Sequence, residues 1–333
     1  MHVTFFEIED WERNYLQNAI VGNTLSFSKE PLSVVNLSLF IDTQVLSTFI
    51  YSRLTEDFLS QLPNLKLITT RSTGFDHIDV EYCRKHKIIV CNVPTYGVNT
   101  IAEHTLALIL VLSRKIIPSV EQTRKGDFRL DNLRGFELAN KKLGIIGLGH
   151  IGKRVAEIAS AFQMKILVNT RHPDENFGAK YEIKYSDLET LLKESDIITL
   201  HTPLTSETKH LINKENIKIM KKDTILVNTS RGAIIETEAL LWALENGILK
   251  GVGLDVLEEE CVLKEERELL TKEFLLTCDL KTQLLNHVLL TKENVIITPH
   301  NAFNSEEALR EILKTTVVNI KAFRENNPVN QIV

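Results

Sequence analysis

An arginine, a run of glutamates and a histidine each follow a different predicted strand of this chain. Arg231 comes after the apolar run 224–227, the glutamates 258–260 come shortly after 251–254, and His300 comes after 295–297. Because the carboxyl ends of parallel strands meet at one edge of a sheet, we expect these side chains to lie close together. A guanidinium can hold a carboxylate bidentately, and an imidazolium can donate a proton to a carbonyl oxygen as hydride reaches its carbon. The set therefore suits reduction of a 2-oxo acid by a nicotinamide, although each residue taken alone could be a surface ion pair or a polar loop residue.

A glycine-rich turn indicates where such a nicotinamide cofactor would bind. The stretch 142–152 is an apolar run that ends in Gly147, Gly149 and Gly152, with His150 and Ile151 between the last two glycines. A helical pattern follows, and a second apolar run, 164–168, completes a βαβ unit. In such a unit the glycines let the backbone approach a pyrophosphate, to which the helix N-terminus offers N–H groups and a positive dipole end. The sequence therefore predicts a dinucleotide-binding site at this turn.

The elements around these residues indicate two α/β domains. Strand patterns alternate with amphipathic stretches at 54–62 and 80–87, and a turn-rich boundary at 92–97 precedes a helix over 100–117 that is apolar on nearly every face. We place that helix between domains or subunits, and we expect 258–294 to be largely helical. The predicted strands are 3–6, 34–40, 65–70 and 88–92 in the first domain, and in the second they end near 168, 201, 228, 255 and 298.

The last amphipathic helix, from 308 to 323, determines how the domains are assigned. If it returns to the first domain, that domain is discontinuous. We predict two doubly wound parallel-sheet domains: a flavodoxin-like substrate domain, 1–98 and 301–333, and a Rossmann dinucleotide-binding domain, 99–300, inserted into it.

Composition excludes several other classes of protein. A hydrophobic content of 43%, a net charge of −5 and the absence of a dense basic cluster argue against nucleic-acid or membrane binding. We expect no signal peptide, because the N-terminal residues show no basic segment followed by a long apolar core, and the longest apolar run, 106–112, is too short to span a bilayer. The cysteines, Cys83, Cys91, Cys261 and Cys278, lack metal-ligand spacing. We therefore expect a cytoplasmic protein without a metal site.

The chain resembles the D-isomer-specific 2-hydroxyacid dehydrogenases, and among them most closely the D-lactate dehydrogenases. The resemblance covers nearly the whole chain. It rests on RSTGFDHID at 71–79, NVPTY at 92–96, IAEHT at 101–105, GLGHIG at 147–152, HTP at 201–203, NTSRG at 228–232, GLDV at 253–256 and TPHNA at 298–302.

The resemblance assigns roles to the chemical residues. It implies that Arg231 binds substrate, that His300 is the acid/base, and that Glu260 is its partner, because the family places that acid five residues after the aspartate that is Asp255 here. The usual proline after the glutamate is Cys261 in this chain. Glu260 is also expected to shift His300 toward its protonated form and so to favour reduction.

The resemblance also implies the residues that surround substrate and cofactor. The backbone of Thr73 and Gly74 should meet the substrate carboxylate, with Tyr96 beside it, and Tyr51 and Phe303 should enclose a small 2-substituent. Further residues should line the cofactor, with Asp255 on the nicotinamide amide: His201, Pro203, Thr208, Thr229 and Ser230.

The identity of the cofactor and of the substrate stays open. An acid usually ends the second strand of an NAD-binding βαβ unit, but here Thr170 stands in its place and Arg171 follows. We therefore expect NAD(P)(H) and slightly favour NADP(H), although Arg171 could instead stack on adenine or face solvent. Pyruvate and D-lactate are the predicted pair, while glyoxylate or hydroxypyruvate reduction, 2-oxobutyrate as a substrate, a cofactor-sensing corepressor-like role and an inactive dinucleotide-binding fold are alternatives. A homodimer is expected.

Overall fold

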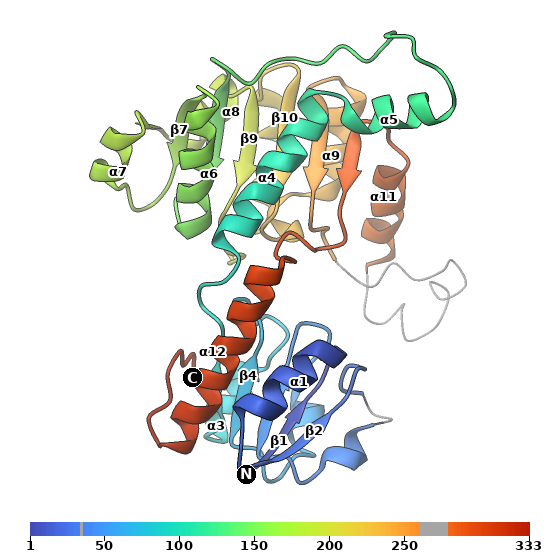
Figure 1. The fold of residues 1–333 in the computed structure, drawn as a ribbon. Helices are drawn as coiled ribbons and strands as arrows, with labels where there is room; N and C mark the ends of the chain where they lie inside the picture. Colours follow the sequence, from blue (N-terminus) through green and yellow to red (C-terminus); the bar gives the residue numbers. More distant parts are fainter. Residues whose placement is uncertain (34–35, 260–278) are drawn as a thin grey trace. The chain divides into compact units, whose positions relative to one another are not determined.

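The computed structural model describes residues 1–33, 36–259 and 279–333, so Glu260 and Cys261 lie outside the described residues. The chain divides into two compact units, Met1–Gly97 with Asn304–Val333, and Val98–Phe303. Each unit is an α/β structure on its own sheet of parallel strands (Figure 1). The predicted fold class of two parallel-sheet α/β domains is therefore confirmed.

The first unit has the strand order β2-β1-β3-β4-β5, which is the flavodoxin-like order. In such a sheet the order reverses between β1 and β3, and ligands bind beyond the carboxyl ends of the strands at that point. The strands are β1 His2–Phe5, β2 Thr24–Phe27, β3 Val45–Thr48, β4 Leu67–Thr70 and β5 Ile89–Cys91. The helices are α1 Asp10–Ala19, α2 Glu56–Leu59, α3 Val80–Lys85 and α12 Glu306–Arg324.

The predicted strand at 34–40 is wrong. Leu37–Phe40 is a short 3-10 helix, and residues 34 and 35 lie outside the described residues. The physical reason is local turn chemistry, because the Asn36 side chain accepts a hydrogen bond from Ser33 N (2.8 Å) and donates one to Pro31 O (2.8 Å). The central strand of this region is instead β3, which is buried along its whole length.

Helix α12 joins the C-terminal segment to the first unit. Its buried residues recur at helical spacing, and it packs against α1 and β4. Asn319 is fully buried, and its Nδ2 donates to Asn92 O (2.9 Å) and to Thr69 Oγ1 (3.3 Å). A buried amide must find hydrogen-bond partners, so these bonds fix the helix against the sheet.

The second unit has the order β12-β11-β10-β9-β6-β7-β8, a Rossmann order extended by one strand. The order reverses between β6 and β9, where dinucleotides bind in such sheets. The strands are β6 Lys142–Ile146, β7 Lys165–Asn169, β8 Lys184–Tyr185, β9 Ile197–Leu200, β10 Thr224–Asn228, β11 Leu249–Leu254 and β12 Val295–Ile297. The helices are α4 Val98–Ser113, α5 Ile116–Arg124, α6 His150–Ala161, α7 Glu175–Lys180, α8 Leu188–Glu194, α9 Thr237–Glu245 and α11 Leu280–Leu290.

The apolar helix expected over 100–117 ends earlier and is buried within its own unit. Lys115 has a φ of 56°, which separates α4 from α5. Helix α4 packs against α6, β10 and β11 (Figure 1). Gly253 permits close packing on β11, because a Cβ there would lie 3.2 Å from the Leu108 side chain. The sheet and α6 therefore cover the buried face of α4, and its expected place between domains or subunits stays a prediction.

Two further expectations concern the helical region 258–294 and the absence of a membrane-spanning helix. The region 258–294 contains α11, and its part from 260 to 278 lies outside the described residues. Within 1–33, 36–259 and 279–333, none of the helices has the length and apolar character needed to span a bilayer.

Candidate active site

The glycine turn after β6 has the shape that a dinucleotide phosphate requires. Gly147 has a φ of +96°, and a Cβ there would lie 2.4 Å from His201 O. A Cβ on Gly152 would lie 2.1 Å from Gly147 O, whereas one on Gly149 would meet no atom within 4 Å. Gly149 is also the N-cap of α6. The outer glycines are therefore required by packing, and the middle one leaves open space at a helix N-terminus, which fits a pyrophosphate.

His201 follows β9 and packs directly against this turn. Its backbone N–H donates to Ile146 O (2.8 Å), and its Nε2 is hydrogen-bonded to Thr199 Oγ1 (3.0 Å). Burial lowers the pKa of its imidazole from 6.5 to about 3. His201 is therefore neutral near pH 7.

The turn after β10 presents Arg231 and is organised by the side chain of Asn228. Asn228 is fully buried; its Oδ1 accepts from Ser230 N (3.0 Å), and its Nδ2 donates to Arg231 O (2.8 Å). Ser230 Oγ donates to Leu200 O (2.9 Å), and Thr229 Oγ1 is hydrogen-bonded to Thr105 Oγ1 (2.9 Å). One Arg231 nitrogen, Nη1, donates to Ser230 O (2.8 Å). These bonds fix the backbone from which the guanidinium projects.

His300 lies in a loop that the buried carboxylate of Asp255 holds from both sides. Asp255 Oδ1 accepts from Thr298 Oγ1 (2.5 Å) and Asn301 N (3.0 Å), and its Oδ2 accepts from Ala302 N (2.9 Å). His300 itself has a φ of 51°, a conformation that costs free energy in a non-glycine residue unless its surroundings impose it. The contact of Asp255 with a nicotinamide amide stays a prediction.

A histidine that the sequence reasoning did not assign extends this network. His104 Nε2 is 3.1 Å from Thr298 Oγ1. The Thr298 hydroxyl donates to Asp255, so it accepts its hydrogen bond from His104. His104 belongs to the IAEHT motif at 101–105, but nothing in that motif indicated that its partner is Thr298, 194 residues further along the chain.

The glutamate run after β11 separates into different roles. Glu258 Oε2 accepts from Thr237 N (3.0 Å) and Thr237 Oγ1 (2.8 Å), and Oε1 contacts His210 Nε2. Glu259 Oε2 accepts from Asp279 N (2.8 Å). Two of the three carboxylates thus bind neighbouring segments, and Glu260, the expected partner of His300, lies outside the described residues.

The expected substrate residues of the first unit lie in strand-end loops. Thr73 Oγ1 donates to Val93 O (2.8 Å), and Thr73 O accepts from Asn92 Nδ2 (2.8 Å). Neither the Thr73 nor the Gly74 backbone N–H donates to another residue that the structure describes. Tyr51 is 62% exposed and Tyr96 is half-buried. Phe303, which is half-buried, belongs to the second unit.

The residues expected at the adenosine end have partners of their own. Arg171 Nη1 forms an ion pair with Glu207 Oε2 (2.9 Å), and both side chains are exposed. Thr170 Oγ1 accepts a long hydrogen bond from His172 N (3.4 Å). Glu207 was not predicted from the sequence, and its carboxylate occupies one nitrogen of the Arg171 guanidinium.

The loop after β9 closes on itself through Thr208. Its hydroxyl donates to Pro203 O (2.6 Å) and accepts from Thr205 N (2.7 Å). Thr208 therefore shapes the loop that carries Pro203. In the second unit, the predicted residues follow neighbouring strands of one sheet: 147–152 after β6, 201–208 after β9, 229–231 after β10, 255 after β11 and 300 after β12.

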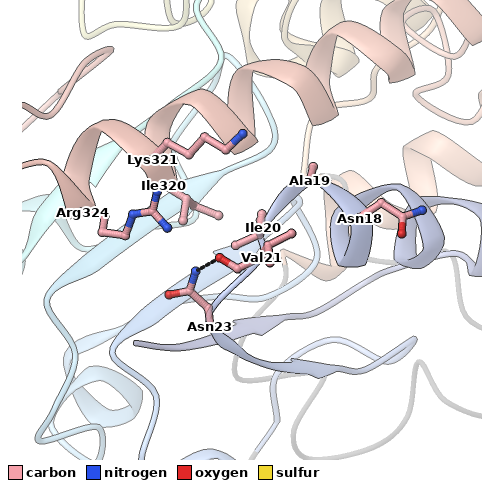
Figure 2. A pocket seen from close by; sticks show the side chains of 8 residues that line it. All are labelled: Asn18, Ala19, Ile20, Val21, Asn23, Ile320, Lys321 and Arg324. Carbon is pink, nitrogen blue, oxygen red and sulfur yellow. Dashed lines mark hydrogen bonds between the residues drawn. The ribbon is translucent and has the colours of Figure 1, made fainter.

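A cavity of about 350 Å³ in the first unit is lined by none of the predicted site residues. It is found where α1 and α12 end, and Lys321 and Arg324 project from α12 beside it (Figure 2). The carboxyl ends of the two helices carry partial negative charge, which opposes the anion that these two cations would attract. Among the described residues, no group of three or more His, Cys, Asp or Glu side chains could hold a metal ion.

Comparison with known proteins agrees with this geometry. Residues 106–302 match the family described as D-isomer specific 2-hydroxyacid dehydrogenase, NAD binding domain. A glyoxylate reductase of Aeropyrum pernix is 37% identical over 291 residues, which are 85% of this chain and 81% of that protein. D-lactate dehydrogenase kk1H of Curvularia clavata is 34% identical over 98% of this chain and 94% of its own. The crystal structure of an Aquifex aeolicus D-lactate dehydrogenase complexed with NAD and lactic acid superposes with a TM-score of 0.86 at 38% identity, covering 98% of this chain and 99% of that one.

Proposed function

The chain belongs to the D-isomer-specific 2-hydroxyacid dehydrogenase family, a premise from which we propose that it interconverts pyruvate and D-lactate. The observation that carries the choice of substrate is the similarity, over nearly the full length of both chains, to a D-lactate dehydrogenase whose structure holds lactic acid. In the first unit, the exposed Tyr51 would border the methyl group of pyruvate. Reduction of pyruvate by the purified enzyme tests the proposal.

The roles of the residues follow from their chemistry and position. A bound nicotinamide supplies the hydride that C2 of the 2-oxo acid receives. Arg231 binds the carboxylate through its planar fork, and the N–H groups of Thr73 and Gly74 donate further hydrogen bonds to it. His300 gives a proton to the carbonyl oxygen, so that the 2-hydroxy acid forms, and Glu260 orients its imidazole.

Glyoxylate reduction is the second candidate function. The 37% identity to a glyoxylate reductase over most of this chain favours it. Glyoxylate lacks the methyl group of pyruvate, and one methyl group in an apolar pocket changes kcat/KM by only about 10- to 200-fold. Comparing kcat/KM for pyruvate, glyoxylate and hydroxypyruvate distinguishes the two activities.

We further propose that the enzyme accepts NADPH beside NADH, with a small preference for NADPH. Thr170 removes the acid that would repel a 2′-phosphate, and Arg171 is a cation at the same strand end. His150 and Ile151 would offer backbone N–H groups to the pyrophosphate. The ion pair with Glu207 limits this preference, because the carboxylate competes with the phosphate for the guanidinium.

Replacing Arg171 by alanine is therefore expected to raise KM for NADPH about ten-fold and to leave KM for NADH nearly unchanged. Replacing Glu207 by glutamine should lower KM for NADPH, because it frees Arg171 and removes a negative charge. Initial rates of cofactor oxidation give both constants. Arg84→Ala is the matched control, since Arg84 is an exposed arginine paired with a glutamate in the first unit. Equal changes in KM for both cofactors after Arg171→Ala would show that this side chain does not bind the 2′-phosphate.

The proposed assembly is a homodimer. Helix α5 exposes Ile116, Ile117 and Val120, each at least 40% exposed, and the loop beyond it exposes Phe128 and Leu130 at 77% and 84%. Large exposed apolar side chains grouped on one helix and the loop after it are typical of an interface. Sedimentation equilibrium should give twice the mass of the chain, and the Val120→Asp variant should have a mass closer to that of a single chain. A wild-type monomer at micromolar concentration would refute the proposal.

We also place the enzyme in the cytoplasm. Cys83 and Cys91 are free and buried, and burial raises the pKa of each thiol to about 11, as suits a protein in a reducing compartment. Cell fractionation with an antibody against the chain tests the location.

A further inference from the structure

The carboxylate of Glu7 holds the loop that carries Tyr51. Glu7 follows β1, and its Oε1 accepts from Ser52 N (2.9 Å) and from the Ser52 hydroxyl. Its Oε2 accepts from Tyr51 N (3.1 Å). Both oxygens therefore bind the chain just beyond β3, which is 44 residues away in sequence. Bonds from neutral donors to a carboxylate are among the stronger hydrogen bonds in proteins.

The guanidinium of Arg71 fixes Glu7 in turn. Arg71 follows β4 and is 2% exposed, and its Nη2 donates to Phe6 O (2.8 Å) and to Glu7 O (2.7 Å). Glu7 has a φ of 58°, a left-handed conformation that these two bonds help to impose. Burial lowers the pKa of Arg71, while the carboxylates of Glu12 and Glu7 act in the opposite direction. A buried arginine is retained only where such partners compensate its loss of water.

This pair lies where the sheet of the first unit is expected to bind its ligand. The strand order reverses between β1 and β3, and Glu7 joins the loops that follow these two strands. Arg71 connects these two loops to the loop after β4, because it immediately precedes the Ser72–Gly74 turn. Ser72 Oγ closes that turn with a hydrogen bond to Gly74 O (2.6 Å). One connected set of bonds thus runs from the expected aromatic wall at Tyr51 to the expected carboxylate-binding amides at 73–74.

We propose that Glu7 is a specificity-determining positioning residue, which sets the place of Tyr51 relative to the Thr73–Gly74 turn and so the size of 2-oxo acid that the site accepts. This inference rests on the proposed function. Glu7 touches no reacting atom; it acts through the backbone of Tyr51.

The test is the Glu7→Gln enzyme. Glutamine keeps the shape but has one acceptor oxygen, so its NH₂ group faces a backbone N–H and either Tyr51 or Ser52 loses its bond. KM for pyruvate should rise about ten-fold with a smaller change in kcat, and KM for the cofactor should stay unchanged. The ratio of kcat/KM for pyruvate to that for 2-oxobutyrate should fall, because a displaced Tyr51 no longer restricts the 2-substituent. Glu30→Gln is the matched control, since the exposed Glu30 carboxylate forms no hydrogen bond or ion pair with another described residue.

Hydrogen exchange separates this inference from the proposed function. The amides of Tyr51 and Ser52 should exchange faster in Glu7→Gln than in the wild type without any substrate present. A lower unfolding free energy with unchanged KM and unchanged substrate ratio would overturn the proposal and leave Glu7 a purely structural residue. Unchanged exchange at both amides would overturn it as well. If the wild type reduces no 2-oxo acid, the proposed function fails, and the exchange result alone decides whether Glu7 positions Tyr51.

Discussion

Replacing His300 by glutamine is expected to lower kcat by about 10²–10⁴-fold, the range that general acid catalysis contributes. Glutamine has similar size but cannot transfer a proton to the carbonyl oxygen. The loop should keep its conformation, because Asp255 binds the backbone of Asn301 and Ala302 and the hydroxyl of Thr298, none of which changes. The effect should therefore fall on turnover and not on folding.

The measurement combines steady-state turnover with cofactor binding. Quenching of protein fluorescence by the reduced cofactor should give a Kd within about two-fold of the wild type, a difference of less than about 0.5 kcal/mol. His86→Gln, an exposed histidine in the first unit, is the control and should keep full turnover. Wild-type kcat in His300→Gln would remove His300 from the mechanism.

Replacing Arg231 by lysine is expected to lower kcat/KM for the 2-oxo acid by about 30- to 1000-fold, or about 2–4 kcal/mol. The charge is kept, but the planar pair of donors that matches a carboxylate is lost. Asn228 and Ser230 fix the backbone of this turn. The shorter lysine side chain therefore cannot shift its ammonium group to replace both N–H donors of the guanidinium.

Initial rates over a range of pyruvate concentrations give the value for Arg231→Lys. Arg310→Lys, on the exposed face of α12, controls for the substitution itself. A loss in kcat/KM smaller than about three-fold would mean that Arg231 does not bind the substrate carboxylate bidentately.

Parts of the fold with a strong local pattern could be predicted from the sequence. The longer strands of the second unit are mostly buried apolar runs, and β7, β9, β10, β11 and β12 all end within two residues of the predicted ends. Prediction failed where the pattern was weak or misleading. Strand β2 is only partly buried, and the apolar residues at 37–40 form a 3-10 helix. Tertiary packing determines the secondary structure of such segments, and the local spacing of apolar residues carries no information about that packing.

The candidate site was predictable as residue types at strand ends, but not as a network. The glycine turn follows from spacing, and its open middle position agrees with that expectation. The support of Asp255 for the His300 loop and that of Glu7 for Tyr51 join residues more than 40 positions apart, each through a single polar side chain. Hydrophobic periodicity describes which face is buried, so it carries no information about these bonds.

The most direct measurement is the configuration of the product. The enzyme is incubated with pyruvate and each reduced cofactor in turn, the loss of absorbance of the reduced cofactor is followed, and the lactate formed is resolved by chiral chromatography. Our account predicts rapid oxidation of at least one cofactor, with D-lactate as the sole product. Formation of L-lactate, or no oxidation of either cofactor with pyruvate, glyoxylate or hydroxypyruvate, would contradict it.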